Sequence, residues 1–217
     1  TAAHTVRTNR SIILPLLFAS VTVWFALTAC TRGVVSQGRH PEGIRPVEPQ
    51  PAAESLEGGL TVLYFDGFFR HINELPTGAE ALRHGRPGKS VSMIDHRFGS
   101  GEVFDSGRSR GVGVQMSGFI NFPESGQYVF KARANDGVRV FIDSTRIIND
   151  PEVHAARFSR ETLLEVPAAG WYPLLIQYFQ RKGTAMLELY WRKPGKDKFS
   201  IMPAEAYAHL AADGLPQ

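Results

Sequence analysis

The feature that most constrains the fold is the alternation of apolar and polar residues between Ser117 and Asp143. Every second residue from 128 to 134 is apolar, and the pattern returns from 138 to 142. A turn that contains proline and glycine, residues 123–126, precedes the first run. A period of two between turn residues indicates half-buried antiparallel strands, whereas an amphipathic helix repeats about every 3.6 residues. This stretch therefore predicts consecutive strands of a sheet with one buried face.

Other segments of the chain carry a similar signal and extend the prediction to the whole C-terminal part. Apolar runs separated by turn residues predict strands at 60–65, 112–122, 162–166, 171–180 and 185–192. Residues 70–111 lack this pattern over most of their length and are expected to be rich in loops. Short strands at this spacing predict an all-β, antiparallel β-sandwich or barrel.

The corner between two predicted strands is the first candidate for a site. Asn135, Asp136 and Gly137 form a tight polar turn there, because Asn-Gly and Asp-Gly pairs favour such turns. The turn also places two oxygen-bearing side chains next to each other. Two interpretations stay open: a ligand-binding corner made of these three residues, or a polar turn whose side chains cap the backbone.

The N-terminal part is predicted to be a membrane segment. Residues 11–31 carry no charge and, as a helix, would be about 30 Å long, which matches the core of a bilayer. Arg7 and Arg10 precede the run, which favours a cytoplasmic N-terminus and an exported remainder. The predicted anchor residues are Ile12, Leu14, Leu17, Phe18, Val21, Trp24 and Phe25.

The same segment allows a second interpretation. Residues 27–30, Leu-Thr-Ala-Cys, resemble a bacterial lipobox, in which the signal peptide is removed and the cysteine, here Cys30, is lipidated. Against this, the apolar run is longer than the roughly 7–15 residues of the apolar region (h-region) of a usual signal peptide. A retained single-pass helix and a lipid anchor therefore both remain, and both predict a bacterial membrane protein whose domain lies on the periplasmic or other extracytoplasmic side.

Composition divides the chain into three parts. Residues 1–30 are the predicted anchor or signal segment, and residues 31–57 are rich in proline and glycine and are predicted to be a linker. Residues 58–217 are predicted to form the β-sandwich domain.

Several functional classes find no support in the sequence. Cationic and acidic residues are interspersed and the net charge is only +3, so no nucleic-acid partner is expected. The histidines show no zinc-binding spacing, and the only cysteine is Cys30. Residues 107–111 match Gly-x-Ser-x-Gly, but a nucleophile elbow needs a helix after the serine, and a strand is predicted there. We therefore expect a protein that is not an enzyme.

The order of motifs resembles the PA14 domain. The motifs are Gly-Leu-x-x-x-Tyr-Phe at 59–65, Ser-Gly-Phe-Ile-x-Phe-Pro-x-Ser-Gly-x-Tyr-x-Phe at 117–130, Ala-x-Asp-Gly-Val-Arg-Val-Phe-Ile-Asp at 134–143, Ala-Gly-Trp-Tyr-Pro-Leu-x-Ile-x-Tyr-Phe-Gln at 169–180 and Leu-x-Leu-x-Trp at 187–191. The resemblance covers residues 58 to about 210. It implies a β-sandwich that acts as a non-catalytic binding module, with carbohydrate as the usual ligand class.

The resemblance also bears on metal binding. In the sugar-binding adhesins of the family, two adjacent aspartates in the corresponding loop hold a calcium ion. Here these positions are Asn135 and Asp136, so one carboxylate is replaced by an amide. Calcium prefers several hard oxygen ligands, usually with more than one carboxylate. The expectation is therefore no cofactor, with calcium at Asn135 and Asp136 as the alternative.

These features support two functional hypotheses of different classes. In the first, a membrane-tethered, non-catalytic accessory subunit docks its PA14-like domain on the periplasmic face of a larger membrane complex, photosynthetic or respiratory; its partners are the lipid bilayer and other subunits. In the second, an envelope lipoprotein binds a glycan, with or without calcium, through Asn135, Asp136 and Gly137.

Overall fold

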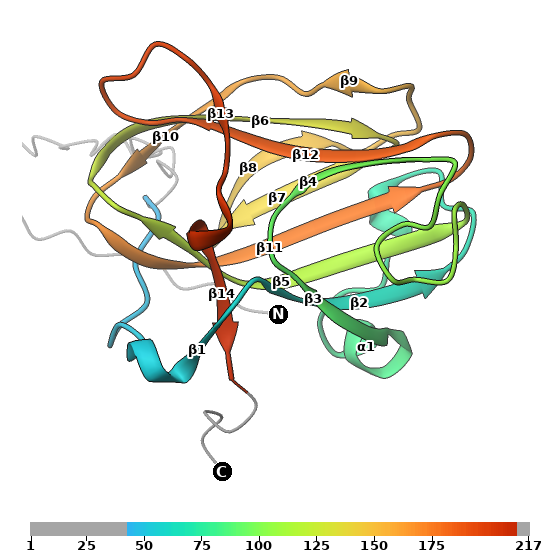
Figure 1. The fold of residues 1–217 in the computed structure, drawn as a ribbon, viewed down its shortest axis with the longest axis horizontal. Coiled ribbons are helices and arrows are strands. Elements are labelled where there is room, and N and C mark those ends of the chain that lie inside the picture. Colours follow the sequence, from blue (N-terminus) through green and yellow to red (C-terminus); the bar gives the residue numbers. More distant parts are fainter. Residues whose placement is uncertain (1–42, 212–217) are drawn as a thin grey trace, which may run out of the picture. The chain divides into compact units, whose positions relative to one another are not determined.

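The structure, a computed structural model, describes residues 43–211, which lie within one compact unit. Two antiparallel sheets pack face to face as a β-sandwich (Figure 1). This confirms the fold class predicted from the alternating stretch. The predicted anchor residues, Cys30 and residues 31–42 of the predicted linker lie outside the described residues. No helix within residues 43–211 is long and apolar enough to cross a membrane.

The larger layer, called here the large sheet, has eight strands in the described part of the chain. They are β1 (Leu56–Gly58), β2 (Leu60–Asp66), β3 (Arg86–Val91), β5 (Val112–Phe122), β7 (Val138–Ile142), β8 (Thr145–Asp150), β11 (Gly170–Gln180) and β14 (Tyr207–Leu210). The long strand β5 pairs with β11 along its whole length on one edge, and with β2 and then β14 on the other.

The other layer, called here the small sheet, has six strands within residues 43–211. They are β4 (Asp95–Gly99), β6 (Gly126–Asn135), β9 (Arg157–Phe158), β10 (Thr162–Val166), β12 (Ala185–Arg192) and β13 (Ser200–Ile201). The helix α1 (Gly78–His84) and three 3₁₀ turns (Ala53–Ser55, Ile72–Glu74 and Ala204–Ala206) complete the described elements.

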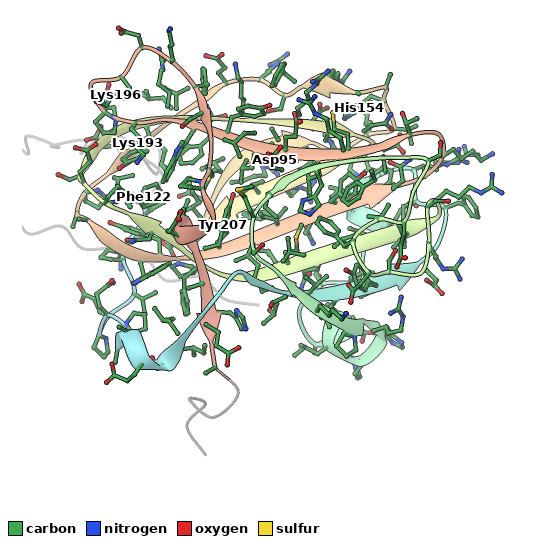
Figure 2. All side chains as sticks on the ribbon, in the orientation of Figure 1. Asp95, Phe122, His154, Lys193, Lys196 and Tyr207 are labelled. Atoms are coloured by element: carbon green, nitrogen blue, oxygen red, sulfur yellow. The ribbon has the colours of Figure 1, made fainter. Side chains whose placement is uncertain are left out.

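The core lies between the two sheets and is made by the alternating residues. Tyr128, Phe130, Ala132 and Ala134 of β6 are buried, as their spacing predicts. Phe122, labelled in Figure 2, lies in an aromatic group with ring centroids 4.8 Å from Tyr128, 5.2 Å from Tyr172 and 6.4 Å from Trp191. Burying a side chain of this size stabilises the fold by about 1.5–3 kcal/mol.

A smaller apolar cluster lies at one end of the sandwich. Phe179 of β11 is fully buried there together with Phe65, Ile72, Leu75 and Ala81. This cluster fixes the segment between β2 and α1 against the end of β11. Figure 1 shows the arrowheads of β6 and β11 pointing toward the same end of the molecule.

The segment 70–111 contains more regular structure than its sequence suggests. It holds α1, β3 and β4. The strand β3 contains Pro87, Gly88 and Lys89, so it lacks the apolar alternation that marks the other strands. Its position is set instead by pairing with β2, from Leu60 opposite Val91 to Tyr64 opposite Arg86. Tertiary pairing thus overrides weak local propensity here.

The described end of the predicted linker, residues 43–57, packs on the sandwich. Ile44 is 2% exposed and belongs to the main core. The backbone amide of Val47 donates to the carbonyl of Trp171, and the side chain of Gln50 accepts from the amide of Trp171 at 2.7 Å. Leu56, Glu57 and Gly58 then pair with β14 as β1. One buried apolar side chain, hydrogen bonds to Trp171 and strand pairing together fix this proline-rich segment to the domain.

Candidate functional site

The predicted corner is the point at which the chain passes from the small sheet to the large sheet. Asn135 is the last residue of β6, and Val138 is the first of β7. The peptide bond between Asn135 and Asp136 is cis. Asp136 and Gly137 are buried, whereas Asn135 is half-buried. Within residues 43–211 the side chain of Asn135 makes no hydrogen bond.

The carboxylate of Asp136 is held by backbone donors. Its Oδ1 accepts from the amide of His154 at 3.2 Å, and its Oδ2 accepts from the amide of Arg181 at 2.7 Å. Asp136 is 3% exposed. A buried carboxylate is costly unless it is hydrogen-bonded, and two amides at these distances meet that need. Asp136 therefore joins the segment after β8 to the segment after β11.

A buried tyrosine supports the corner from inside. The hydroxyl of Tyr178 donates to the backbone carbonyl of Asn135 and lies 3.0 Å from Oε1 of Gln180. Gln180 in turn donates to the carbonyl of Lys182 at 2.9 Å. Burial, helped by the nearby charge of Asp136, raises the pKa of Tyr178 well above its ordinary value, so the hydroxyl stays protonated and remains a donor.

Gly137 is required by close packing. A Cβ at this position would lie 2.8 Å from the carbonyl oxygen of Pro151 and closer still to the ring of Phe179. Only glycine therefore lets the turn approach these two groups. The corner thus rests directly on the smaller apolar cluster.

A pocket of about 500 Å³ opens beside this corner and is called here the corner pocket. Its lining residues are Arg70, His71, Glu152, Val153 and Arg181. Arg181 is itself a donor to Asp136, and Val153 precedes the second donor, His154. Figure 2 shows His154 close to β9. Residues far apart in the sequence therefore meet around the predicted turn.

The walls of the corner pocket are fixed by backbone contacts. His71 and Glu152 form an isolated antiparallel bridge, and the amide of Ile72 donates to the carbonyl of Pro151 at 2.8 Å. The Nδ1 atom of His71 accepts from the amide of Asn73 at 3.1 Å, which fixes the imidazole ring against this turn. Walls held in this way need little reordering when a ligand binds.

A neighbouring carboxylate, Asp150, is already engaged by side chains. Arg157 binds it with Nε at 3.0 Å and Nη2 at 2.5 Å, and this pairing raises the pKa of Arg157. The Nε2 atom of His154 also lies 3.2 Å from Asp150, although without the geometry of a hydrogen bond. Asp150 is thus a structural partner for these two residues.

The aromatic residues of β11 and β12, which could stack on a sugar ring if exposed, are mostly part of the core. Tyr172, Tyr178 and Trp191 are buried. Trp171 and Tyr190 are half-buried, and Tyr190 donates its hydroxyl to Glu188 at 2.9 Å. The corner pocket contains none of these rings.

The sequence family follows from a direct match. Comparison with protein-family profiles matches the PA14 domain at residues 94–204, which is just over half of the chain. This chain belongs to the PA14 domain family. Comparison with curated protein sequences gives no match.

Solved structures share the fold of this PA14 domain at low sequence identity. The PA14 domain of the antifreeze protein MpAFP has a TM-score of 0.60 and 14% identity, over 75% of this chain and 96% of that one. The Epithelial Adhesin 9 A domain from Candida glabrata, in complex with Galβ1-4GlcNAc, has a TM-score of 0.57 and 10% identity, over 79% and 98%. An anti-sigma factor domain-containing protein has a TM-score of 0.59 and 20% identity; the match covers 74% of this chain and half of that protein.

The corner of this PA14 domain does not fit the ligand set of a calcium site. It offers one carboxylate, Asp136, whose two oxygens already accept backbone amides. Residues 43–211 contain no group of three or more His, Cys, Asp or Glu side chains arranged to hold a metal ion. Two arginines, Arg70 and Arg181, line the adjacent pocket. Calcium favours the opposite environment, with several anionic oxygens.

The sequence identified the turn but not the pocket. Arg70, His71, Glu152 and Val153 carry no motif, and Arg181 belongs to a segment that reads only as a turn between two strands. They meet because β2, β8 and β11 end at the same edge of the fold. The weak signal that remains in the sequence is an arginine directly after each of two apolar segments, at Arg70 and Arg181.

Proposed function

We propose that this protein binds carbohydrate, and that the sugar occupies the corner pocket next to Asn135 and Asp136. The observation that carries the proposal is a pocket with preformed walls beside the turn for which the family resemblance implies a ligand. The likeness of the fold to an adhesin domain solved with Galβ1-4GlcNAc supports it.

The chemistry of the pocket suits a sugar. Carbohydrate ligands need several polar groups in fixed positions and a small apolar surface for the C–H face of the ring. The guanidinium groups of Arg70 and Arg181, the imidazole of His71 and the carboxylate of Glu152 supply hydrogen-bonding groups. Val153 is 47% exposed and supplies the apolar surface. Recognition by these groups involves no covalent step, and the proposed protein is a binding module without catalytic activity.

Binding to a panel of immobilised glycans tests the proposal. The full chain is expected to bind at least one glycan, and Val153→Trp, which fills the pocket, is expected to weaken this binding by about tenfold or more, that is about 1.4 kcal/mol. The matched control is Leu163→Trp, since Leu163 is 60% exposed on β10. Absence of binding to every glycan rejects the function, and equal binding by both variants rejects the pocket as its site.

We also propose that residues 11–31 attach the domain to a membrane, where it docks on a larger complex as an accessory subunit. The uncharged run of bilayer length and the basic residues before it support this second proposal. Either a retained helix or a lipid on Cys30 provides the attachment.

Intact mass and extraction from membranes test this second proposal. A diacylglyceryl group on Cys30 as the new N-terminal residue supports the lipid anchor, and a mass that includes residues 1–29 supports the retained helix. Co-purification with other subunits in mild detergent supports the accessory role. Recovery of the chain alone would argue against that role, and recovery from the aqueous fraction would argue against any attachment.

A further inference from the structure

The corner pocket is lined by more positive than negative side chains. Its lining contains two guanidinium groups, Arg70 and Arg181, against one carboxylate, Glu152. Among residues 43–211, neither Arg70 nor Arg181 forms an ion pair with a carboxylate. Neither guanidinium group lies against an aromatic ring of the described residues. By contrast, two arginines on strands of the small sheet are paired with carboxylates: Arg97 with Glu188 and Arg157 with Asp150. The pocket therefore has a surplus of unpaired positive charge.

The side chain of Arg181 also has a hydrogen-bond donor without a partner among the described residues. Its Nε atom is buried, and within the described residues it has no hydrogen-bond partner. A buried donor without a partner is unfavourable, because it has lost its contacts with water and gained none. Arg181 also lines the corner pocket, so a ligand there can reach the guanidinium group. Guanidinium groups bind carboxylate, phosphate or sulfate oxygens with paired, charge-assisted hydrogen bonds.

The backbone of Arg181 holds this side chain in place. Its amide donates to Asp136 at 2.7 Å, and its carbonyl accepts from the amide of Gly111 at 3.2 Å. The two carboxylate oxygens of Asp136 accept from the backbone amides of Arg181 and His154. Asp136 therefore forms no ion pair with the guanidinium of Arg181 among the described residues. The guanidinium group of Arg181 is therefore available to an anionic group of a ligand that enters the corner pocket.

We propose that the corner pocket recognises an acidic sugar, a uronic acid or a sulfated residue, whose anionic group binds Arg181 and Arg70 directly and without calcium. This inference rests on the carbohydrate-binding function proposed above and specifies its ligand class. The arginines take the place that a cation has in a calcium-dependent sugar site. Val153 then contacts the uncharged part of the ring.

Calorimetric titration of the full chain tests the inference. The probes are a galacturonic acid trimer, a galactose trimer of the same length, galactose 6-sulfate and inorganic sulfate, each with EDTA and with calcium. We expect at least one of the two acidic sugars to bind about tenfold or more tightly than the galactose trimer, and EDTA to change nothing. The comparison of uronate with sulfated sugar identifies the anionic group. Because the contact is ionic, affinity is also expected to fall as salt is added.

Variants connect the binding to the arginines. Arg181→Gln is expected to reduce the affinity for the acidic sugar by about tenfold or more, and Arg181→Lys to restore only part of it, because lysine lacks the paired donors. Arg70→Gln is expected to have a smaller effect, since Arg70 is exposed. The matched control is Arg146→Gln, an exposed arginine near the start of β8, and it should bind as the native protein does.

The outcomes separate this inference from the broader function. Equal binding of the acidic and neutral trimers, unchanged in Arg181→Gln, would overturn the inference and leave carbohydrate binding intact. Binding of the acidic sugar only when calcium is present would also overturn it. Binding of inorganic sulfate but of no sugar would reject carbohydrate as the ligand and with it both proposals.

Discussion

The carboxylate of Asp136 and the backbone amide of Arg181 are joined by a 2.7 Å hydrogen bond. Asp136 is the first residue after β6 of the small sheet, and Arg181 is the first residue after β11 of the large sheet. One bond thus links the ends of the two layers at the edge where the candidate pocket lies. The same carboxylate holds the amide of His154. The residue that the sequence singled out as a ligand is therefore also the support of the site.

Asp136→Asn tests this supporting role. The asparagine amide has one acceptor oxygen, so it can satisfy only one of the two backbone donors and presents an N–H₂ group to the other. Leaving a buried donor without a partner costs about 1–3 kcal/mol. We expect the free energy of unfolding, measured with urea, to fall by about this amount.

The control for this change is Asp197→Asn. Asp197 is exposed in the turn after β12, and surface substitutions of this kind usually change stability by no more than about 0.5 kcal/mol. Equal stability of the two variants would show that the carboxylate of Asp136 is not needed by the fold.

The sheet framework was predictable because its signal is local. The strands β5, β10 and β12 begin and end where the alternation and the turn residues indicated, at Val112–Phe122, Thr162–Val166 and Ala185–Arg192. By contrast, β3 contains Pro87 and Gly88, and β9 has two residues. Such strands exist only because a neighbour pairs with them, and that neighbour is distant in the sequence.

The candidate site was predictable only in part, for the same physical reason. Asn135, Asp136 and Gly137 are consecutive, so composition alone marks a tight turn. The guanidinium groups of Arg70 and Arg181 come from segments more than one hundred residues apart, and nothing local indicates that they meet. Likewise, the burial of Ile44 depends on a space between the sheets that only the folded chain defines.

Gly137→Ala tests the packing under the turn. The added methyl group would collide with the ring of Phe179 and with the carbonyl of Pro151. Inserting a methyl group into a tightly packed core costs about 1–3 kcal/mol. We expect a loss of this size in thermal or urea unfolding of the full chain. The matched change Gly58→Ala should have little effect, since nothing lies within 4 Å of the added carbon; a similar loss in both variants would contradict the packing argument.

Ile44→Ala tests whether the segment before the first strand is part of the folded unit. Ile44 is 2% exposed and contacts the main core, so truncation removes buried apolar surface and leaves a cavity. Changes of this kind cost about 2–5 kcal/mol. The control is Leu82→Ala, because Leu82 is 75% exposed on α1 and should tolerate truncation. A stability loss from Ile44→Ala no larger than that of the control would mean that this segment contributes little to the domain.

His96 provides a test of pH dependence. Burial lowers the pKa of its imidazole below the ordinary value of 6.5, against a smaller opposing effect of Asp95. The ring stacks on Phe98, with centroids 5.1 Å apart, and lies 4.6 Å from Phe104. Because the folded state resists protonation while the unfolded state accepts it, the unfolded chain binds more protons just below pH 6.5. The contribution of His96 to stability is therefore complete above this pH and declines as the pH falls below it.

The measurement is the free energy of unfolding between about pH 7.5 and pH 5, a range that spans the ordinary titration of histidine. In His96→Phe, which keeps an aromatic ring between Phe98 and Phe104, the loss of stability on acidification should be smaller than in the native protein. Other groups titrate in the same range in both proteins, so the difference between the slopes isolates His96. Identical slopes for the native protein and His96→Phe would show that the imidazole is equally easy to protonate in the folded and unfolded chains, and hence that the edge between β3 and β4 is open to water.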